Sequence, residues 1–234
     1  MQLWLVSLNL APRGRNNFRN NIGLLFGFAR SRSYLAKGRA TEAEDLTKAR
    51  EHDSEIGIFT PGQLEKLLRK ADESLVLYLS IGAFAGLRTA ELQRLEWSEV
   101  KLDQGVIEVT AKKAKTGSRR LIPIQPNLRA WIRPFVRKEG LVCWLSTINQ
   151  KASAFARSQD IQWPQNALRH SFASYRLAQL KNTAEVALEM GNSPAMIFKH
   201  YRELVTPVDA EWWWKIEPMA DSKVTPSTPI RAAS

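Results

Sequence analysis

Three short segments of the sequence combine side chains that bind an anion with a side chain that attacks one. They are residues 86–92 (Gly-Leu-Arg-Thr-Ala-Glu-Leu), residues 167–173 (Ala-Leu-Arg-His-Ser-Phe-Ala) and residues 190–201, which begin Met-Gly-Asn-Ser-Pro and end in a tyrosine. The first two contribute Arg88 and Arg169, and guanidinium groups suit phosphate-type oxygens because they are always charged and donate two parallel hydrogen bonds. The third contributes Tyr201, whose hydroxyl is among the side-chain groups that form covalent intermediates. The residue types are compatible with binding of an anion and with nucleophilic chemistry.

Basic residues gather in two parts of the sequence. The chain has 234 residues and a net charge of +11, yet residues 1–41 contain no acidic residue and a second basic cluster lies within residues 112–120. Such patches usually bind a polyanion, most often nucleic acid. On charge alone, a generally solvated basic surface remains the alternative. The basic residues expected to contact DNA are Arg13, Arg15, Arg19, Lys112, Lys113, Arg119 and Arg120.

Several other classes of protein are excluded by composition. The single cysteine, Cys143, excludes a disulfide within the chain and fits a reducing cytosol. With one cysteine and three histidines, the sequence offers no Cys/His zinc site. The longest apolar run, residues 75–87, is shorter than the roughly 20 residues of a membrane span, and we find no signal peptide. We expect a soluble, cytoplasmic protein.

The elements that must position the three segments are mostly helical. An amphipathic helix with a basic outer surface is predicted around residues 18–29, followed by a polar segment that we interpret as a linker. The sequence Thr60-Pro61-Gly62-Gln63 is typical of a helix start with a capping box, and a buried helix follows from about Ser74 to the helix-ending Gly86. A short helix over residues 89–95 would carry the first arginine at its start.

One hairpin and further helices complete the predicted fold. Residues 106–109 and 120–124 are expected to pair as antiparallel strands around a basic turn. Helices are predicted around residues 128–135, over residues 168–180 and 183–190, and from the two pairs Ser193-Pro194 and Thr206-Pro207. The resulting fold class is mainly α with a small antiparallel β-sheet (α+β).

In order and spacing, the three segments and the basic hairpin closely resemble the tyrosine recombinase (phage integrase) family. They match its Gly-Leu-Arg-x-x-Glu-Leu box, its Leu-Arg-His-Ser/Thr-Phe-Ala box and its terminal tyrosine, which lies nine residues after Asn192. The resemblance covers about residues 59–216 and implies the catalytic fold of the family. It also implies site-specific recombination or integration of double-stranded DNA by a mobile genetic element, a tetramer on DNA, and no cofactor.

The resemblance assigns a role to each matching residue. Tyr201 would attack a DNA phosphodiester and form a covalent 3′-phosphotyrosine, which the 5′-hydroxyl of a second strand then reverses. Arg88 and Arg169 would bind the non-bridging oxygens of the transition state. Lys115 is the best match to the lysine that protonates the leaving 5′-oxygen, with Lys113 and Lys112 as neighbours in case the register differs by one or two residues. We expect Glu91 to orient local structure.

Two histidine positions of the family's site are asparagine in this sequence. They are Asn166, three residues before Arg169, and Asn192. Asparagine donates a hydrogen bond but carries no charge and relays no proton. Either both residues act as neutral donors in a working site, or the protein is a DNA-binding remnant that cleaves weakly or not at all. We expect a structural role for His170 and a His200 that points away from Tyr201.

The resemblance also suggests a domain organisation. Residues 1–41 would be part of a helical core-binding (SAM-like) DNA-binding domain, residues 42–58 a linker, residues 59–216 the catalytic domain and residues 217–234 a disordered tail. The cluster Trp212-Trp213-Trp214 would either dock into a partner protomer of a tetramer or pack on its own chain. A third activity, DNA relaxation as in type IB topoisomerases, is disfavoured because the motifs match integrases and the chain is short.

Overall fold

A computed structural model describes residues 1–36, 38, 40–51, 56–113, 119–201 and 204–219. The chain forms two compact units, Met1–Glu55 and Ile56–Ser234. The predicted lysine of the hairpin turn, Lys115, lies outside the described residues, as does most of the predicted C-terminal tail. Among the described helices, none is long and apolar enough to cross a membrane.

The first unit is built on one long helix. A short helix α1 (Gln2–Ser7) precedes α2 (Pro12–Ser31), which begins with a proline at its first position. The side chain of Asn16 on α2 binds the backbone of Ala49 through its amide NH₂ (2.9 Å) and its oxygen (2.8 Å). Leu46 is buried as well. Residues 42–51, which we predicted as part of the linker, therefore pack against α2.

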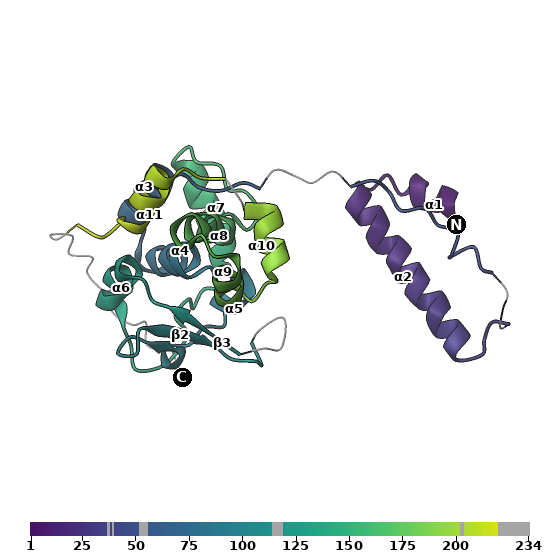
Figure 1. Cartoon of the computed structure of the whole chain (residues 1–234), viewed down its shortest axis with the longest axis horizontal. Coiled ribbons are helices and arrows are strands. Elements are labelled where there is room, and N and C mark those ends of the chain that lie inside the picture. Colours follow the sequence, from purple (N-terminus) through teal and green to yellow (C-terminus); the bar gives the residue numbers. More distant parts are fainter. Residues whose placement is uncertain (37, 39, 52–55, 114–118, 202–203, 220–234) are drawn as a thin grey trace, which may run out of the picture. The chain divides into compact units, whose positions relative to one another are not determined.

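The interior of the second unit is the helix α4 (Glu73–Ala85). Its residues are all buried, and Gly86 ends it in a left-handed conformation with φ of 64°. A Cβ on Gly86 would lie 2.2 Å from the ring of Phe172, so both the left-handed backbone and the lack of space require glycine at this position. Helix α4 contacts α3 (Pro61–Lys70), α5 (Thr89–Leu92), α6 (Pro126–Ile132), α7 (Ile148–Ser158) and α8 (Ala167–Leu180), and Figure 1 shows it surrounded by its neighbours.

The sheet has three antiparallel strands in the order β1-β2-β3. They are β1 (Val100–Lys101), β2 (Val106–Val109) and β3 (Arg120–Pro123). Ile107 pairs with Ile122, and both side chains are buried in the core. The predicted hairpin is present as β2 and β3, whereas β1 has no counterpart in the sequence prediction.

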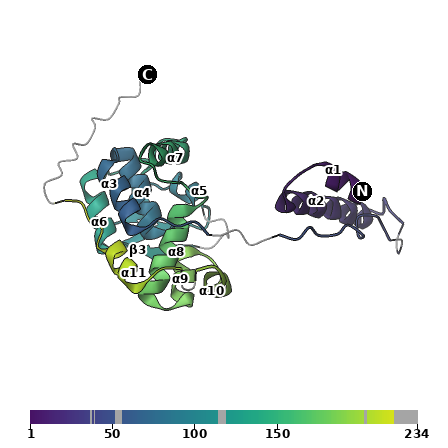
Figure 2. The same cartoon turned by 90° about the horizontal axis from the view of Figure 1, so that it is seen from above.

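The C-terminal helices pack beside α8. They are α9 (Thr183–Met190), α10 (Pro194–Tyr201) and α11 (Pro207–Trp214), and Figure 2 shows them gathered on one side of the unit. Short 3₁₀ turns lie at Trp97–Glu99 and Arg133–Phe135. The capping box at Thr60 and the N-cap of Thr206 are formed as the sequence predicted.

Helix α11 packs on its own chain. Trp213 is completely buried and stacks on Tyr175 of α8, with 4.0 Å between ring centroids. Trp212 is half-exposed and donates from its indole nitrogen to Glu65 of α3 at 3.3 Å. Of the two alternatives for the tryptophan cluster, this structure has the one within the chain.

Candidate active site

The centre of the site is the C-terminal end of helix α9, where three arginines converge. The backbone carbonyls of residues 189–191 accept in turn from Arg120 (Nε, 3.0 Å), Arg169 (Nη2, 2.7 Å) and Arg88 (Nη2, 2.8 Å). The last carbonyls of a helix have no donor within the helix, and the negative end of the helix dipole favours cations. Gly191, with φ of 62°, ends α9 and turns its carbonyl toward Arg88.

A single buried carboxylate, that of Glu91, connects two of these arginines. Its oxygens accept from Arg120 (Nη1, 3.1 Å; Nη2, 2.6 Å) and from Arg88 (Nη1, 2.9 Å). It also accepts from the backbone N–H of Arg88 at 2.9 Å, which fixes the start of α5. Burial acts to raise the pKa of Glu91, but the hydrogen bonds from Arg120 and Arg88 outweigh it and lower the pKa to about 2.

Asn192 joins Arg88 to Arg169. Its side-chain oxygen accepts from Arg88 at 3.0 Å and from Arg169 at 3.2 Å, while Arg169 also donates to the carbonyl of Gly86 at 2.5 Å. An amide has one acceptor oxygen and one NH₂ group. With its oxygen held by the two arginines, Asn192 has its NH₂ group to offer to a ligand.

Tyr201 at the end of α10 contacts a histidine on α8. Its hydroxyl oxygen lies 2.8 Å from Nδ1 of His170, and its side chain is buried. Burial raises the pKa of Tyr201, although the charge of Arg169 acts in the opposite direction. Burial, Arg169 and His200 lower the pKa of His170 below its ordinary value. At neutral pH the pair is therefore a neutral phenol and a neutral imidazole.

The site has an excess of positive charge, which favours the binding of an anion. Among the residues that the structure describes, the carboxylate of Glu91 binds the guanidinium groups of Arg88 and Arg120 and acts electrostatically on that of Arg169, so three positive charges share one negative charge. Burial and the neighbouring Arg88 lower the pKa of Arg169 to about 9, so its charge is present at neutral pH but stabilised less than usual. A bound phosphate would supply the missing negative charge.

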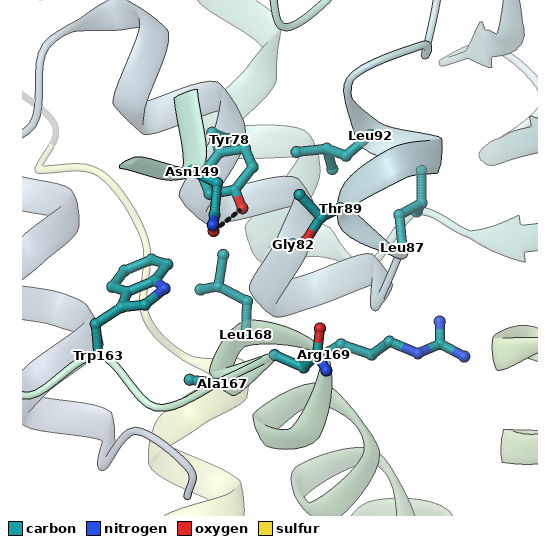
Figure 3. A pocket seen from close by; sticks show the side chains of 11 residues that line it. Tyr78, Gly82, Leu87, Thr89, Leu92, Asn149, Trp163, Ala167, Leu168 and Arg169 are labelled. Carbon is teal, nitrogen blue, oxygen red and sulfur yellow. Dashed lines mark hydrogen bonds between the residues drawn. The ribbon is translucent and has the colours of Figure 1, made fainter. Parts of the chain in front are cut away.

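Asn166 lines the same pocket as Arg169. It precedes α8 with a left-handed φ of 56°, and its side chain is exposed. It lines a pocket with Trp163, Tyr78 and Asn149, in which the Tyr78 hydroxyl donates to Asn149 at 3.0 Å. Figure 3 shows the guanidinium group of Arg169 extending away from Trp163. No hydrogen bond links Asn166 to the arginine cluster among the residues that the structure describes.

The residues predicted to contact DNA lie in different environments. Arg120 differs from the expectation for a surface cation, because it is buried and bound to Glu91. Lys113 pairs with Glu96 and Glu99 at 2.9 Å each, and the exposed Arg119 pairs with Glu108. The remaining four are the exposed Lys112 and Arg13 and the half-buried Arg15 and Arg19.

The contacts of two site residues, Arg120 and His170, were not predicted from the sequence. The strand alternation could have placed Arg120, because it lies on the same face of β3 as the inward-facing Ile122. The contact of His170 with Tyr201 joins residues 31 apart, and no local pattern indicates it. The part of the chain that the structure describes contains no group of three or more His, Cys, Asp or Glu residues that could hold a metal ion.

Comparison with known proteins gives a family and a fold. The sequence matches the phage integrase family over residues 58–204. A comparison with curated proteins gives no significant match.

Three solved structures are similar to this chain. The first is lambda integrase as a dimer bound to a COC′ core site, with a TM-score of 0.65 and 13% identity over 83% of this chain and 76% of that chain. The second is the Tn1549 transposon integrase in complex with a circular intermediate DNA, with a TM-score of 0.62 and 17% identity over 90% and 81%. The third is a lambda integrase tetramer bound to a Holliday junction, with a TM-score of 0.59 and 13% identity over 76% and 57%. The predicted fold class is confirmed.

Proposed function

The chain belongs to the phage integrase family, as its motifs predicted, and on this premise we propose that it cleaves and rejoins DNA at a specific site through a covalent bond to Tyr201. The observation that carries the proposal is that Arg88, Arg169 and Asn192 converge at the end of α9, while Tyr201 contacts His170, the residue next to Arg169. These residues come from three separate parts of the sequence. Their convergence provides a phosphate-binding surface beside a nucleophile.

In the first step, the scissile phosphate binds to the arginine cluster. Arg88 and Arg169 are pre-positioned by the carbonyl groups of α9, so they need little rearrangement to receive the charge of a pentacoordinate transition state. The NH₂ group of Asn192 donates to the same phosphate. Glu91 holds Arg88 in place, and Arg120 in turn holds Glu91.

In the second step, the hydroxyl oxygen of Tyr201 attacks phosphorus. The bond between phosphorus and the Tyr201 oxygen forms as the bond to the 5′-oxygen breaks, and the leaving oxygen takes a proton from Lys115. A 5′-hydroxyl of the same or another strand then attacks the phosphotyrosine and releases Tyr201. The number of phosphoester bonds is conserved, so the reaction needs no external energy source.

Neither asparagine can act as an acid or a base in this reaction. General acid–base groups contribute about 10²–10⁴-fold in rate, and an amide cannot supply that contribution. We therefore propose a working site in which Asn166 and Asn192 act as neutral hydrogen-bond donors. The contacts of Asn192 favour this reading over a decayed remnant, because its oxygen has a definite role between the two arginines.

For the assembly, we propose that the protein acts as a tetramer on double-stranded DNA. The similar lambda integrase forms a tetramer on a Holliday junction. Two duplexes with two cleaved strands each require four nucleophiles, which a monomer with a single Tyr201 does not provide. Mass measurement of the complex captured on a junction would test this, and a single bound protomer would contradict it.

The experiment that tests the proposed function is covalent capture of DNA. The protein is incubated with a pool of nicked duplexes of randomised sequence, denatured, and examined for attached DNA, which is then sequenced. We expect a Tyr201-dependent adduct enriched in one sequence. Tyr201→Phe should abolish the adduct and keep DNA binding, whereas the same change at the exposed Tyr34 should alter neither. DNA binding without an adduct in the unmodified protein would identify a remnant.

A second prediction concerns Asn192→His. A neutral imidazole has one acceptor nitrogen and a charged one has none, so histidine cannot accept from Arg88 and Arg169 together. We expect cleavage to fall by about tenfold or more, as for loss of a hydrogen bond to a charged group. Asn166→His, outside the arginine cluster, serves as the comparison. Faster cleavage in Asn192→His would show that the asparagine marks decay.

A further inference from the structure

The contact between His170 and Tyr201 is not accounted for by phosphate binding. The hydroxyl oxygen of Tyr201 and Nδ1 of His170 are 2.8 Å apart, within the range of a hydrogen bond. The rings are tilted by 39° with centroids 5.7 Å apart, so the contact is made through the polar atoms and not by stacking. His170 therefore touches the atom that would attack phosphorus.

His170 is held in place by the first turn of α8. Its backbone N–H donates to the carbonyl of Asn166 at 2.9 Å, and its own carbonyl accepts from the Ser174 hydroxyl at 2.9 Å. Its neighbour Arg169 points to the end of α9, and successive residues of a helix are turned by about 100°. One helical turn thus directs a phosphate-binding group and an imidazole to two sides of the same site.

The protonation states suit a transfer from the phenol to the imidazole. Burial raises the pKa of Tyr201, so almost no phenolate is present at neutral pH and the attack requires a proton acceptor. Burial and Arg169 lower the pKa of His170, so its ring is neutral and Nδ1 is free to accept. Among the described residues, the charged and titratable groups that face the ring are Arg169 on α8 and His200 and Tyr201 on α10.

We propose that His170 is a catalytic residue, which takes the proton of Tyr201 during cleavage and returns it during rejoining. This inference rests on the proposed function. As the bond between the Tyr201 oxygen and phosphorus forms, the hydroxyl proton passes to Nδ1 of His170, and Lys115 protonates the leaving 5′-oxygen. In the reverse step the imidazolium of His170 protonates the departing Tyr201 oxygen. Protons and bonds balance in both directions, and no co-reactant is needed.

The role also gives a physical reason why this site has asparagine at position 166. The exposed side chain of Asn166 lines the pocket beside Trp163, whereas His170 contacts the nucleophile directly. A site with its base at 170 needs no second base at 166. The general base of this chain would then lie four residues, about one helical turn, after Asn166.

The test is the rate of adduct formation by His170→Asn on the nicked duplex pool. Asparagine keeps a polar side chain but takes up no proton, so we expect a loss of about 10²–10⁴-fold with DNA binding retained. His200→Asn is the matched control, because His200 is next to Tyr201 and its ring lies 6.3 Å from that of Tyr201. We expect the control to cleave at nearly the unmodified rate.

A sulfur leaving group separates a base for Tyr201 from an acid for the 5′-oxygen. A 5′-phosphorothiolate in the duplex releases a thiolate, which needs no proton, so it should restore cleavage to a variant that lacks the leaving-group acid. We expect His170→Asn to remain slow on this substrate by the same factor. Restored cleavage would place His170 on the leaving oxygen and overturn the proposal.

The pH dependence of the cleavage rate of the unmodified protein tests the proposal without a variant at position 170. Because protonated His170 cannot accept a proton, cleavage should fall in acid, and this fall should persist in His200→Asn. The midpoint of the fall should lie below the ordinary histidine value of about 6.5, since burial and Arg169 lower the pKa of His170. A rate that stays constant down to the pH at which the protein begins to unfold would overturn the proposal. An unchanged rate in His170→Asn would overturn it while leaving the proposed function intact, whereas no adduct in the unmodified protein would overturn both.

Discussion

At the scale of single residues, Glu91 is the group on which the arrangement of the arginines depends. Its carboxylate binds Arg88 and Arg120 while almost wholly buried. Glu91→Gln would remove the charge that compensates them, and breaking a buried pair costs about 3–5 kcal/mol. We expect that loss in the free energy of unfolding, measured by urea denaturation. Glu211→Gln, at an exposed pair with Lys215, is the control and should have little effect.

The same residue predicts a pH dependence of stability. The pKa of Glu91 is about 2 in the folded protein and 4.5 ordinarily, so the folded state binds the proton less readily than the unfolded state. The resulting stabilisation, about 3 kcal/mol, is fully present above pH 4.5 and is lost as the pH falls toward 2. Denaturation curves at several pH values should show this loss in the unmodified protein but not in Glu91→Gln. Equal slopes in both would contradict the assignment.

The sequence identified the types of side chain in the site better than their contacts. Arg88, Arg169, Asn192 and Tyr201 were selected from motifs, and the structure brings them together. The motif could not show that the oxygen of Asn192 joins two arginines, because that contact depends on how α9 ends. Likewise, the sequence does not distinguish Arg120 from the surface cations of the basic hairpin, because its burial depends on the fold.

At the scale of elements, helix α11 supports the helix that carries two site residues. Trp213 of α11 stacks on Tyr175 of α8, and α8 begins with Arg169 and His170 in its first turn. Trp213→Ala would leave a cavity in the core and should cost about 3–5 kcal/mol of unfolding free energy. Trp212→Ala removes the neighbouring, half-exposed ring and should cost much less. Equal losses would show that burial of Trp213 does not hold α11 in place.

Some elements were predictable because their ends have strong local signals. The capping box at Thr60, the left-handed Gly86 and the proline at the start of α11 each leave a mark in the sequence. Strand β1 has two residues, too few for an alternation to be visible. Helix α7 was missed because its N-cap residue, Thr147, makes no side-chain capping bond and no proline follows it.

At the scale of the whole molecule, each of the two units has buried residues of its own, but the second has far more. In the first unit, buried apolar residues are Leu5, Ala43 and Leu46 among those described, whereas the large core of the second unit surrounds α4. Stability rises with the surface that a fold buries. We expect the first unit to unfold at a lower temperature than the second, in two separate calorimetric transitions.

A chain that begins at Ile56 should therefore keep the main thermal transition and the arginine cluster, and lose affinity for DNA. It lacks Arg13, Arg15 and Arg19, and each phosphate contact contributes about 0.9 to the slope of log affinity against log salt concentration. The affinity of the fragment and of the whole chain for the captured duplex should be measured over a range of salt concentrations. Arg13 is exposed, so Arg13→Gln in the whole chain should leave the first unit folded. It should lower the slope by about 0.9, the contribution of one phosphate contact. If the fragment and the whole chain have the same slope, the basic residues of the first unit do not touch the DNA backbone, and affinity then comes from the second unit alone.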